Sequence, residues 1–201
     1  MVCPSRNLSD RSNNMSDFTF TIHTPEDAPE GARAGLEGAK QKMGMVPNLL
    51  GVLAGAPAAL SSYQALAAAF GSSSFSPTEQ QVVLIATSVE NDCRYCVAAH
   101  TTMSKGARVA EDVLDSLRSD LPIADANLEA LRQFTLAAVR KKGWLEAGDL
   151  EAFTAAGYGP AQVLEVITGV ALKTLTNYVN HIAETPLDAP FQAQVWEPAG
   201  V

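Results

Sequence analysis

The sequence predicts an all-α protein, and three features of the chain support that prediction. Alternation of apolar and polar residues, which is typical of half-buried strands, is almost absent. The β-branched residues occur mainly inside patterns that repeat with the helical period. Signals that begin and end helices recur along the whole chain. We therefore expect about eight or nine helices and no sheet.

The first half of the chain contains four expected helices. They run from Pro29-Glu30 to near Gly44, from Pro47 over a short apolar stretch, from Pro57 to Phe70, and from Ser76 through the apolar run Val82–Val89. The last of these has the strongest start signal. In Ser76-Pro77-Thr78-Glu79, the serine is an N-cap, the proline occupies the first helical position and the glutamate the third. We expect Glu79 to act as a capping residue.

The second half contains five more expected helices. They run from Cys93 to Gly106, from Val109 to Leu117, from a cap at Asp125 or Asn127 to Lys142, from Glu146 to Ala156, and from Ala161 to about Glu184. Asn91-Asp92 separates the first of them from the preceding helix. Lys141-Lys142-Gly143 is a stop signal, because positive charge in a last turn is followed by glycine. Beyond Thr185-Pro186 we expect an irregular tail in which Phe191 and Trp196 are packing anchors.

The composition indicates a single globular domain behind a polar tail. Hydrophobic residues make up 47% of the 201 residues, which is enough for a core without disulfide bridges. Residues 1–16 are rich in Ser, Asn and Asp and hold almost no core-forming side chains. We therefore expect a disordered tail there. One helical domain should follow over residues 17–201, with no internal linker.

The charge of the chain disfavours two classes of partner. A net charge of −8 argues against binding to nucleic acid or to an anionic membrane, because both require clustered Lys and Arg. No stretch approaches the ~20 apolar residues of a membrane span. The first residues also lack the apolar core of a signal peptide. We expect a cytoplasmic protein.

The chemistry of the chain is concentrated in a Cys-x-x-Cys pair followed by a histidine. Of three cysteines, Cys3 falls in the expected tail and is given no role. At about 100° per residue, Cys96 lies about 60° and His100 about 20° from Cys93 around a helix. The three side chains therefore share one face, and Cys96 and His100 form an i, i+4 pair within reach of each other.

This arrangement favours thiol redox chemistry. The N-terminus of a helix lowers the pKa of thiols placed there, and a neighbouring histidine can accept a proton or stabilise a thiolate. Arg94 adds positive charge between the cysteines, and Asp92 is suited to be the N-cap. A peroxide would oxidise one cysteine to sulfenic acid, and the other would condense with it to a disulfide. The sequence thus predicts a redox site at Cys93, Cys96 and His100.

Two other interpretations of the cysteines stay open. A structural zinc site needs a fourth ligand and usually a second paired knuckle, whereas the only other histidines are His23 and His181. The cysteines could also be small buried apolar residues. Outside the motif, we expect His181 and Trp144 to be packing residues. Tyr95 is expected to be a pocket wall or a contact to a neighbouring subunit.

These residues resemble the alkylhydroperoxidase D-like group of the carboxymuconolactone decarboxylase superfamily. The similarity rests on Glu90-Asn91-Asp92-Cys93-Arg94-Tyr95-Cys96-Val97-Ala98-Ala99-His100 and the helix Ser76–Glu90 before it. Met45–Leu49 gives weaker support, and Asn177–Ala183 looks like the closing helix of peroxidase-related members. The resemblance extends from about Thr24 to Asp188. It implies a single-domain helical bundle that assembles into homo-oligomers, often trimers or hexamers.

The resemblance also implies a reaction and its partners. The substrate would be a hydroperoxide, reduced through the cysteine pair without haem, metal or another cofactor. Cys96, beside His100, would be the thiol that attacks the peroxide, and Cys93 the resolving thiol. A dithiol or a protein reductant would restore the pair.

The chain departs from the family pattern at two positions. Gln81 stands where a glutamate commonly completes the proton relay, and an amide cannot shuttle a proton. Asp92 stands where the family usually has glycine. Glu90, one turn before Cys93, is our candidate for the missing carboxylate. The second candidate, Glu79, already has the expected capping role.

Two further functions remain as alternatives to a thiol peroxidase. The decarboxylase branch that gives the superfamily its name does not depend on a cysteine pair, so the Cys-x-x-Cys motif argues against it. A redox-sensing or metal-binding oligomeric module would use the same residues without turnover.

Overall fold

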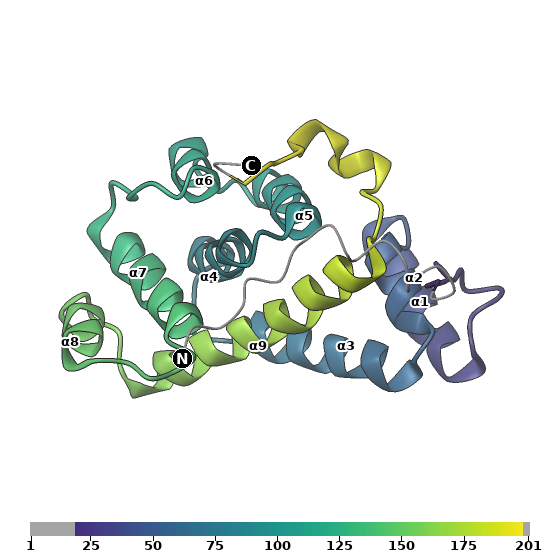
Figure 1. Ribbon diagram of the computed structural model, residues 1–201, viewed down its shortest axis with the longest axis horizontal. Coiled ribbons are helices and arrows are strands. Elements are labelled where there is room, and N and C mark those ends of the chain that lie inside the picture. Colours follow the sequence, from purple (N-terminus) through teal and green to yellow (C-terminus); the bar gives the residue numbers. More distant parts are fainter. Residues whose placement is uncertain (1–18, 199–201) are drawn as a thin grey trace, which may run out of the picture.

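The computed structural model describes residues 19–198, and these residues fold into helices (Figure 1). Within that range there are nine α-helices, one 3-10 helix and no strand. The elements are α1 (Glu30–Met43), α2 (Asn48–Ala54), α3 (Pro57–Gly71), α4 (Pro77–Glu90), α5 (Arg94–Gly106), α6 (Glu111–Arg118), α7 (Ala126–Arg140), α8 (Ala147–Ala155), α9 (Pro160–Ala183) and η2 (Ala189–Gln194). The predicted all-α class is confirmed. The expected disordered tail, residues 1–16, lies outside the described residues.

Helix α4 is the central helix of the bundle. Its start is the predicted capping box: the Glu79 amide donates to Ser76 Oγ at 3.3 Å, and the Ser76 amide donates to Glu79 Oε2 at 2.8 Å. All residues from Val82 to Val89 are buried. They pack against α5, α6, α7 and α9, which surround α4 in Figure 1. The long apolar run of the sequence is therefore the centre of the core.

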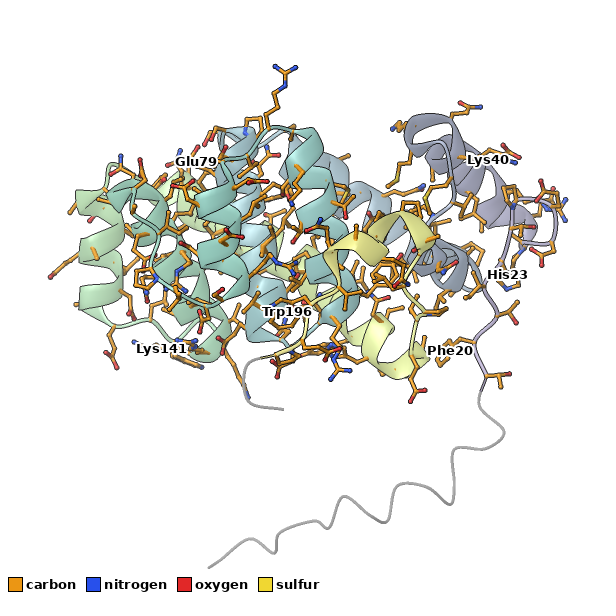
Figure 2. The ribbon with its side chains drawn as sticks, turned by 90° about the horizontal axis from the view of Figure 1, so that it is seen from above. Phe20, His23, Lys40, Glu79, Lys141 and Trp196 are labelled. Carbon is orange, nitrogen blue, oxygen red and sulfur yellow. The ribbon has the colours of Figure 1, made fainter. Side chains whose placement is uncertain are left out.

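Helices α1, α2 and α3 form one end of the molecule, and α7 and α8 form the other. Figure 2 shows the two ends, with Lys40 of α1 far from Lys141, the residue that follows α7. A second cluster of buried residues fills the first end, and Cys93 and Cys96 belong to it together with Leu36, Leu53 and other apolar side chains. The cysteine motif thus lies where α5 meets the α1–α3 end.

Helix α9 connects the two ends. It has 24 residues and packs against α2, α3, α4, α5 and α7. Gly169 permits close packing in its middle, because a Cβ there would lie 2.7 Å from Phe70 Cε2 and 2.7 Å from Val83 Cγ1. Although α9 is long, neither it nor any other described helix has the length and apolar character required to cross a membrane.

The turn between α4 and α5 differs from the expected cap. Asp92 adopts a left-handed φ of 53°, so it ends the turn that follows α4 and is not the N-cap of α5. The N-cap is Cys93, whose amide donates to Ser88 O at 2.9 Å. A left-handed φ favours glycine and is tolerated by aspartate. This conformation explains why aspartate can stand where the family usually has glycine.

The segment after α9 is more regular than expected. Residues from Ala189 to Gln194 form η2, which packs on α5, and the Phe191 amide donates to Asp188 O at 2.9 Å. Both predicted anchors are confirmed, because Phe191 is 5% and Trp196 is 8% exposed.

Two other packing predictions are wrong. Trp144 is 86% exposed, because the chain turns at Gly143 (φ 82°) and leaves the indole outside the bundle. His181 is exposed on the outer face of α9, because Asn177 and Asn180 occupy the inner face of that last turn.

Candidate active site

A cavity of about 220 Å³ lies beside the cysteine motif. Its walls come from α1, α2, α3, α4, α5, α9 and η2, and they are mainly apolar and aromatic. The lining side chains include Leu49, Leu50, Tyr63, Phe70, Leu84, Tyr95, Leu172 and Phe191. The polar lining residues are Gln80, Gln81, Cys96, His100, Lys173 and Thr176. A small apolar chamber therefore opens onto one sulfur and a few polar groups.

The two cysteines are free thiols with different surroundings. Cys93 is fully buried and Cys96 is 1% exposed, yet only Cys96 lines the cavity. Asn180 Nδ2 lies 3.3 Å from Cys96 Sγ and 3.9 Å from Cys93 Sγ. Thr176 Oγ1 lies 3.8 Å from Cys96 Sγ. Helix α9 thus supplies polar partners for both sulfurs.

The pKa values of the two thiols are displaced in opposite directions. Burial alone would raise the pKa of Cys96, but the hydrogen bond from Cys93 and the positive charge of Lys173 hold it well below its usual value. The same hydrogen bond raises the pKa of Cys93, and burial raises it further. The two thiols are therefore unequal, and the thiolate form is favoured at Cys96 over Cys93.

His100 contacts two residues through its ring nitrogens. Its Nε2 lies 3.0 Å from Lys173 Nζ, and its Nδ1 lies 3.1 Å from Gln81 Oε1. An ammonium group only donates, so Nε2 accepts and the ring proton of the neutral imidazole sits on Nδ1, where it is donated to Gln81. Burial and the charge of Lys173 lower the pKa of His100 well below its usual value. The imidazole is therefore neutral at physiological pH.

Lys173 is a buried cation in this site. It is 2% exposed, and no carboxylate of the described residues lies within the 4.0 Å limit of an ion pair with its Nζ. Its Nζ lies 3.0 Å from His100 Nε2, and it lines the cavity together with Cys96, whose pKa its charge lowers. Charged groups are almost never fully buried without a partner. Cys96, which lines the same cavity, is a group that can carry an offsetting negative charge.

The structure thus brings Cys93, Cys96 and His100 together, with Lys173 as an additional member. Cys96 and His100 both line the cavity, and the ring nitrogens of His100 contact Lys173 and Gln81. Tyr95 lines the cavity, so its expected role as a pocket wall is confirmed. Within the described part of the chain, no group of three or more His, Cys, Asp or Glu side chains is arranged to hold a metal ion.

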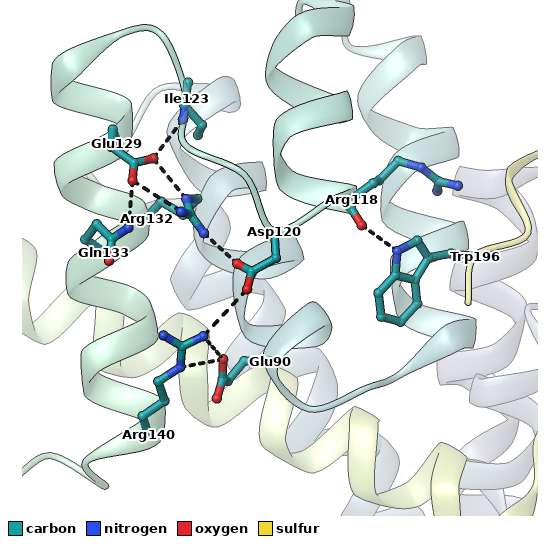
Figure 3. Close-up of polar contacts among 9 residues, drawn as sticks. All are labelled: Glu90, Arg118, Asp120, Ile123, Glu129, Arg132, Gln133, Arg140 and Trp196. Atoms are coloured by element: carbon teal, nitrogen blue, oxygen red, sulfur yellow. Dashed lines mark hydrogen bonds and ion pairs between the residues drawn. The ribbon is translucent and has the colours of Figure 1, made fainter. Parts of the chain in front are cut away.

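Glu90 is not part of this group. Its carboxylate lies 2.8 Å from Arg140 Nε and 2.7 Å from Arg140 Nη2, as Figure 3 shows, in a charged cluster that also contains Asp120. The helix explains this position: Glu90 follows Gln81 by nine residues of α4, which at about 100° per residue rotates it by about 180°. Gln81 faces the cavity, so Glu90 points to the opposite side.

Sequence reasoning missed the residues that α9 contributes. Lys173, Thr176 and Asn180 are separated from His100, Cys96 and Cys93 by 73 to 87 positions, so no local motif connects them. A signal was nevertheless present. The buried residues of α9 repeat at spacings of three and four, and polar residues occupy the later positions of that stripe: Val166, Gly169, Leu172, Lys173, Thr176, Asn177 and Asn180. Polar side chains on a core-facing stripe indicate a site.

Comparisons with known proteins agree with this architecture. Residues 54–138 match the model of the carboxymuconolactone decarboxylase family. Among proteins with curated functions, none matches the chain.

Three solved structures have the same fold. The alkylhydroperoxidase AhpD core of an uncharacterized peroxidase-related protein from Ralstonia eutropha JMP134 is 23% identical with a TM-score of 0.72, over 86% of this chain and 93% of that chain. An uncharacterized peroxidase-related protein from Silicibacter sp. TM1040 is 22% identical with a TM-score of 0.73, over 84% and 90%. The debrominase Bmp8 in complex with 2,3,4-tribromopyrrole is 15% identical with a TM-score of 0.75, over 89% and 96%. The predicted resemblance is confirmed: residues 54–138 match the model of the carboxymuconolactone decarboxylase family, and the chain is similar in fold to the alkylhydroperoxidase AhpD core.

Proposed function

We propose that this protein is a thiol-dependent hydroperoxide reductase whose Cys93–Cys96 pair cycles between dithiol and disulfide. The observation that carries the proposal is the unequal state of two neighbouring thiols. Cys96 lines the cavity with a lowered pKa, and Cys93 is a buried thiol hydrogen-bonded to it. Peroxide reduction of this type needs a reachable thiolate and a second thiol that can close a disulfide.

The reaction follows from these positions in two steps. The Cys96 thiolate attacks the terminal oxygen of the hydroperoxide, the O–O bond breaks, and Cys96 becomes a sulfenic acid while the alkoxide leaves as an alcohol after taking up a proton. The sulfur of Cys93 then attacks the sulfur of Cys96, and the hydroxyl group leaves as water. A dithiol or protein reductant returns two electrons and two protons, which restores the thiolate and the thiol. We place the protein in the cytoplasm, where thiols are kept reduced.

Two cysteine variants test this function. Wild-type protein with excess dithiol should consume an organic hydroperoxide, and Cys96→Ser should lose this turnover. Without added dithiol, Cys93→Ser should consume about one equivalent and stop, with the Cys96 sulfenic acid trapped by a cyclic diketone such as dimedone, whereas wild type should form a disulfide. Cys3→Ser is the matched control and should behave as wild type. Equal turnover by wild type and Cys96→Ser would refute the proposal.

Removal of bromine from an aromatic ring is a second candidate. It is favoured by the rings of Tyr63, Phe70, Tyr95 and Phe191 around the cavity, and by the debrominase that shares the fold. Replacing bromine by hydrogen also consumes two electrons, which the dithiol can supply as it becomes a disulfide. Bromide release from a brominated pyrrole, in the absence of peroxide turnover, would favour this reaction. A decarboxylase would instead keep its activity after both thiols are alkylated.

We also propose that the protein is a homo-oligomer, a trimer or a hexamer, assembled through the outer face of α9. Exposed apolar side chains of α9 lie within about 60° of one another around the helix axis: Leu164, Ile167, Tyr178 and Ile182, with exposures of 70%, 41%, 56% and 59%. The neighbouring α3 contains no charged residue. A copy of the same chain is the partner because the stripe is self-complementary: in an antiparallel pair, Leu164 faces Ile182 and Glu165 faces His181. Such a contact is two-fold, so it would join two trimers into a hexamer, and the trimer itself would need a second, heterologous contact.

A further inference from the structure

Reduction of a hydroperoxide to alcohol and water consumes two protons, and the reduced site must hold both. Cys93 carries one as a thiol. No Asp or Glu among the described residues lines the cavity. Gln81 occupies the position expected for an acid, and Glu90 is paired with Arg140 on the far side of α4. Another group of the cavity must therefore protonate the leaving alkoxide.

The remaining polar groups of the cavity differ in their ability to donate this proton. His100 is neutral, its Nδ1 proton is donated to Gln81 Oε1, and its Nε2 carries no proton. The Tyr95 hydroxyl donates to Asp188 Oδ2 at 2.5 Å, so its proton is engaged away from the sulfur. Lys173 differs from both: it carries a basic amine, lines the cavity beside Cys96, and lowers the pKa of that thiol through its positive charge.

We propose that Lys173 is a catalytic residue, which pairs with the Cys96 thiolate in the resting site and donates its proton to the departing alkoxide. His100 and Gln81 are positioning residues in this scheme. The neutral Nε2 of His100 accepts one N–H bond of the lysine, and Gln81 fixes the tautomer that makes Nε2 an acceptor. The inference rests on the proposed peroxidase function and assigns its proton source.

The protons and electrons balance. Cys96 thiolate, hydroperoxide and the Lys173 ammonium give Cys96 sulfenic acid, alcohol and the neutral Lys173 amine. The Cys93 thiol and the sulfenic acid then give disulfide and water. A dithiol that reduces the disulfide supplies one proton to Cys93 and one to Lys173, and the thiolate–ammonium pair is restored.

This scheme also explains how a lysine can be buried without a carboxylate. In the reduced site its charge is offset by the thiolate, and in the oxidised site both charges have disappeared together. A buried charge is therefore never left unpaired in either state, which avoids the cost of several kcal/mol expected for an isolated buried ion.

The first test measures the thiolate without any peroxide. In a Cys93→Ser background, the rate of Cys96 alkylation by iodoacetamide is followed against pH. With Lys173 present the rate should stay high at about pH 6. With Lys173→Met, burial should keep the pKa of Cys96 at or above the ordinary value of about 8.5, so the rate at about pH 6 should fall by about 300-fold or more. Lys105→Met, on an exposed lysine of α5, is the matched control and should leave the profile unchanged.

Other ionisable groups near the sulfur stay the same in this comparison. They are Tyr95 and His100 of α5, Tyr63 of α3, and Asp188 next to η2, while Cys93 is serine in both proteins that are compared.

The second test separates charge from proton donation. Lys173→Arg retains a cation but cannot release a proton, so Cys96 should remain a thiolate while peroxide turnover falls by about 100-fold or more. Lys173→Met should lose both properties. Circular dichroism confirms folding, and Lys173→Gln, whose amide can still donate to His100, replaces Lys173→Met if that variant unfolds.

The outcomes distinguish this inference from the proposed function. If wild type does not consume peroxide, the peroxidase function fails, and the alkylation profile still decides whether Lys173 pairs with the thiolate. If wild type does consume peroxide, an unshifted alkylation profile in Lys173→Met, or full turnover in Lys173→Arg, overturns the role of Lys173 alone.

Discussion

Gly169→Ala is expected to destabilise the fold at the point where α9 approaches α3 and α4 most closely. The added Cβ would lie 2.7 Å from both Phe70 Cε2 and Val83 Cγ1, two side chains of the buried core. Replacing a helical glycine by alanine by itself stabilises by about 1 kcal/mol. Overpacking a core costs about 1–3 kcal/mol. The gain in helix propensity and the cost of overpacking oppose each other. The control must therefore be a variant that gains helix propensity without overpacking the core.

Gly38→Ala supplies that control. Gly38 lies inside α1, and a Cβ there would meet nothing within 4 Å. Because the helix-propensity gain is common to both variants, their difference isolates the overpacking cost of about 1–3 kcal/mol. At about 2–4 °C per kcal/mol for a chain of this size, Gly169→Ala should melt about 2–12 °C below Gly38→Ala. Thermal unfolding followed by circular dichroism measures this, and equal melting temperatures would refute the packing argument.

Three further predictions concern other parts of the molecule. Glu90→Gln should retain full peroxide turnover and lose at most about 1 kcal/mol in urea unfolding, because it breaks a partly exposed ion pair outside the cavity; a large loss of turnover would return Glu90 to the proton relay. Tyr95→Phe should cost about 1–3 kcal/mol, since the buried hydroxyl that donates to Asp188 and accepts from the Leu49 amide is removed; unchanged urea unfolding would contradict this. Leu164→Glu combined with Ile182→Glu should dissociate the oligomer in light scattering, whereas Trp144→Glu, at the 86% exposed indole, should not.

Local patterns predicted the helices and part of the site. The start of α4 could be predicted because it depends on four consecutive residues only. Ser76 and Glu79 form a capping box, and Pro77 occupies the first helical position. The common face of Cys93, Cys96 and His100 could also be predicted from local sequence, since their spacing in a helix places the three side chains on one side.

The rest of the site depends on contacts between distant segments. Lys173 approaches His100 only because α9 packs across α4 and α5, and no short window of sequence contains that information. The prediction that Glu90 joins the site was based on its short distance along the chain from Cys93. It did not take into account the direction in which the Glu90 side chain points from α4. The turn at Asp92 separates the two helices, so a residue one turn before Cys93 does not share its face.

Because Cys93 is buried, a reductant in the cavity can reach the disulfide only at the sulfur of Cys96. Because only Cys96 faces the cavity, a reductant that enters by the same route as the substrate must form its mixed disulfide with Cys96 and release Cys93 as the leaving thiol. The cavity of about 220 Å³ then also acts as a size filter for that reductant. A slender dithiol fits such a space, whereas a folded protein would have to present a thiol on a narrow extended segment to reach the sulfur.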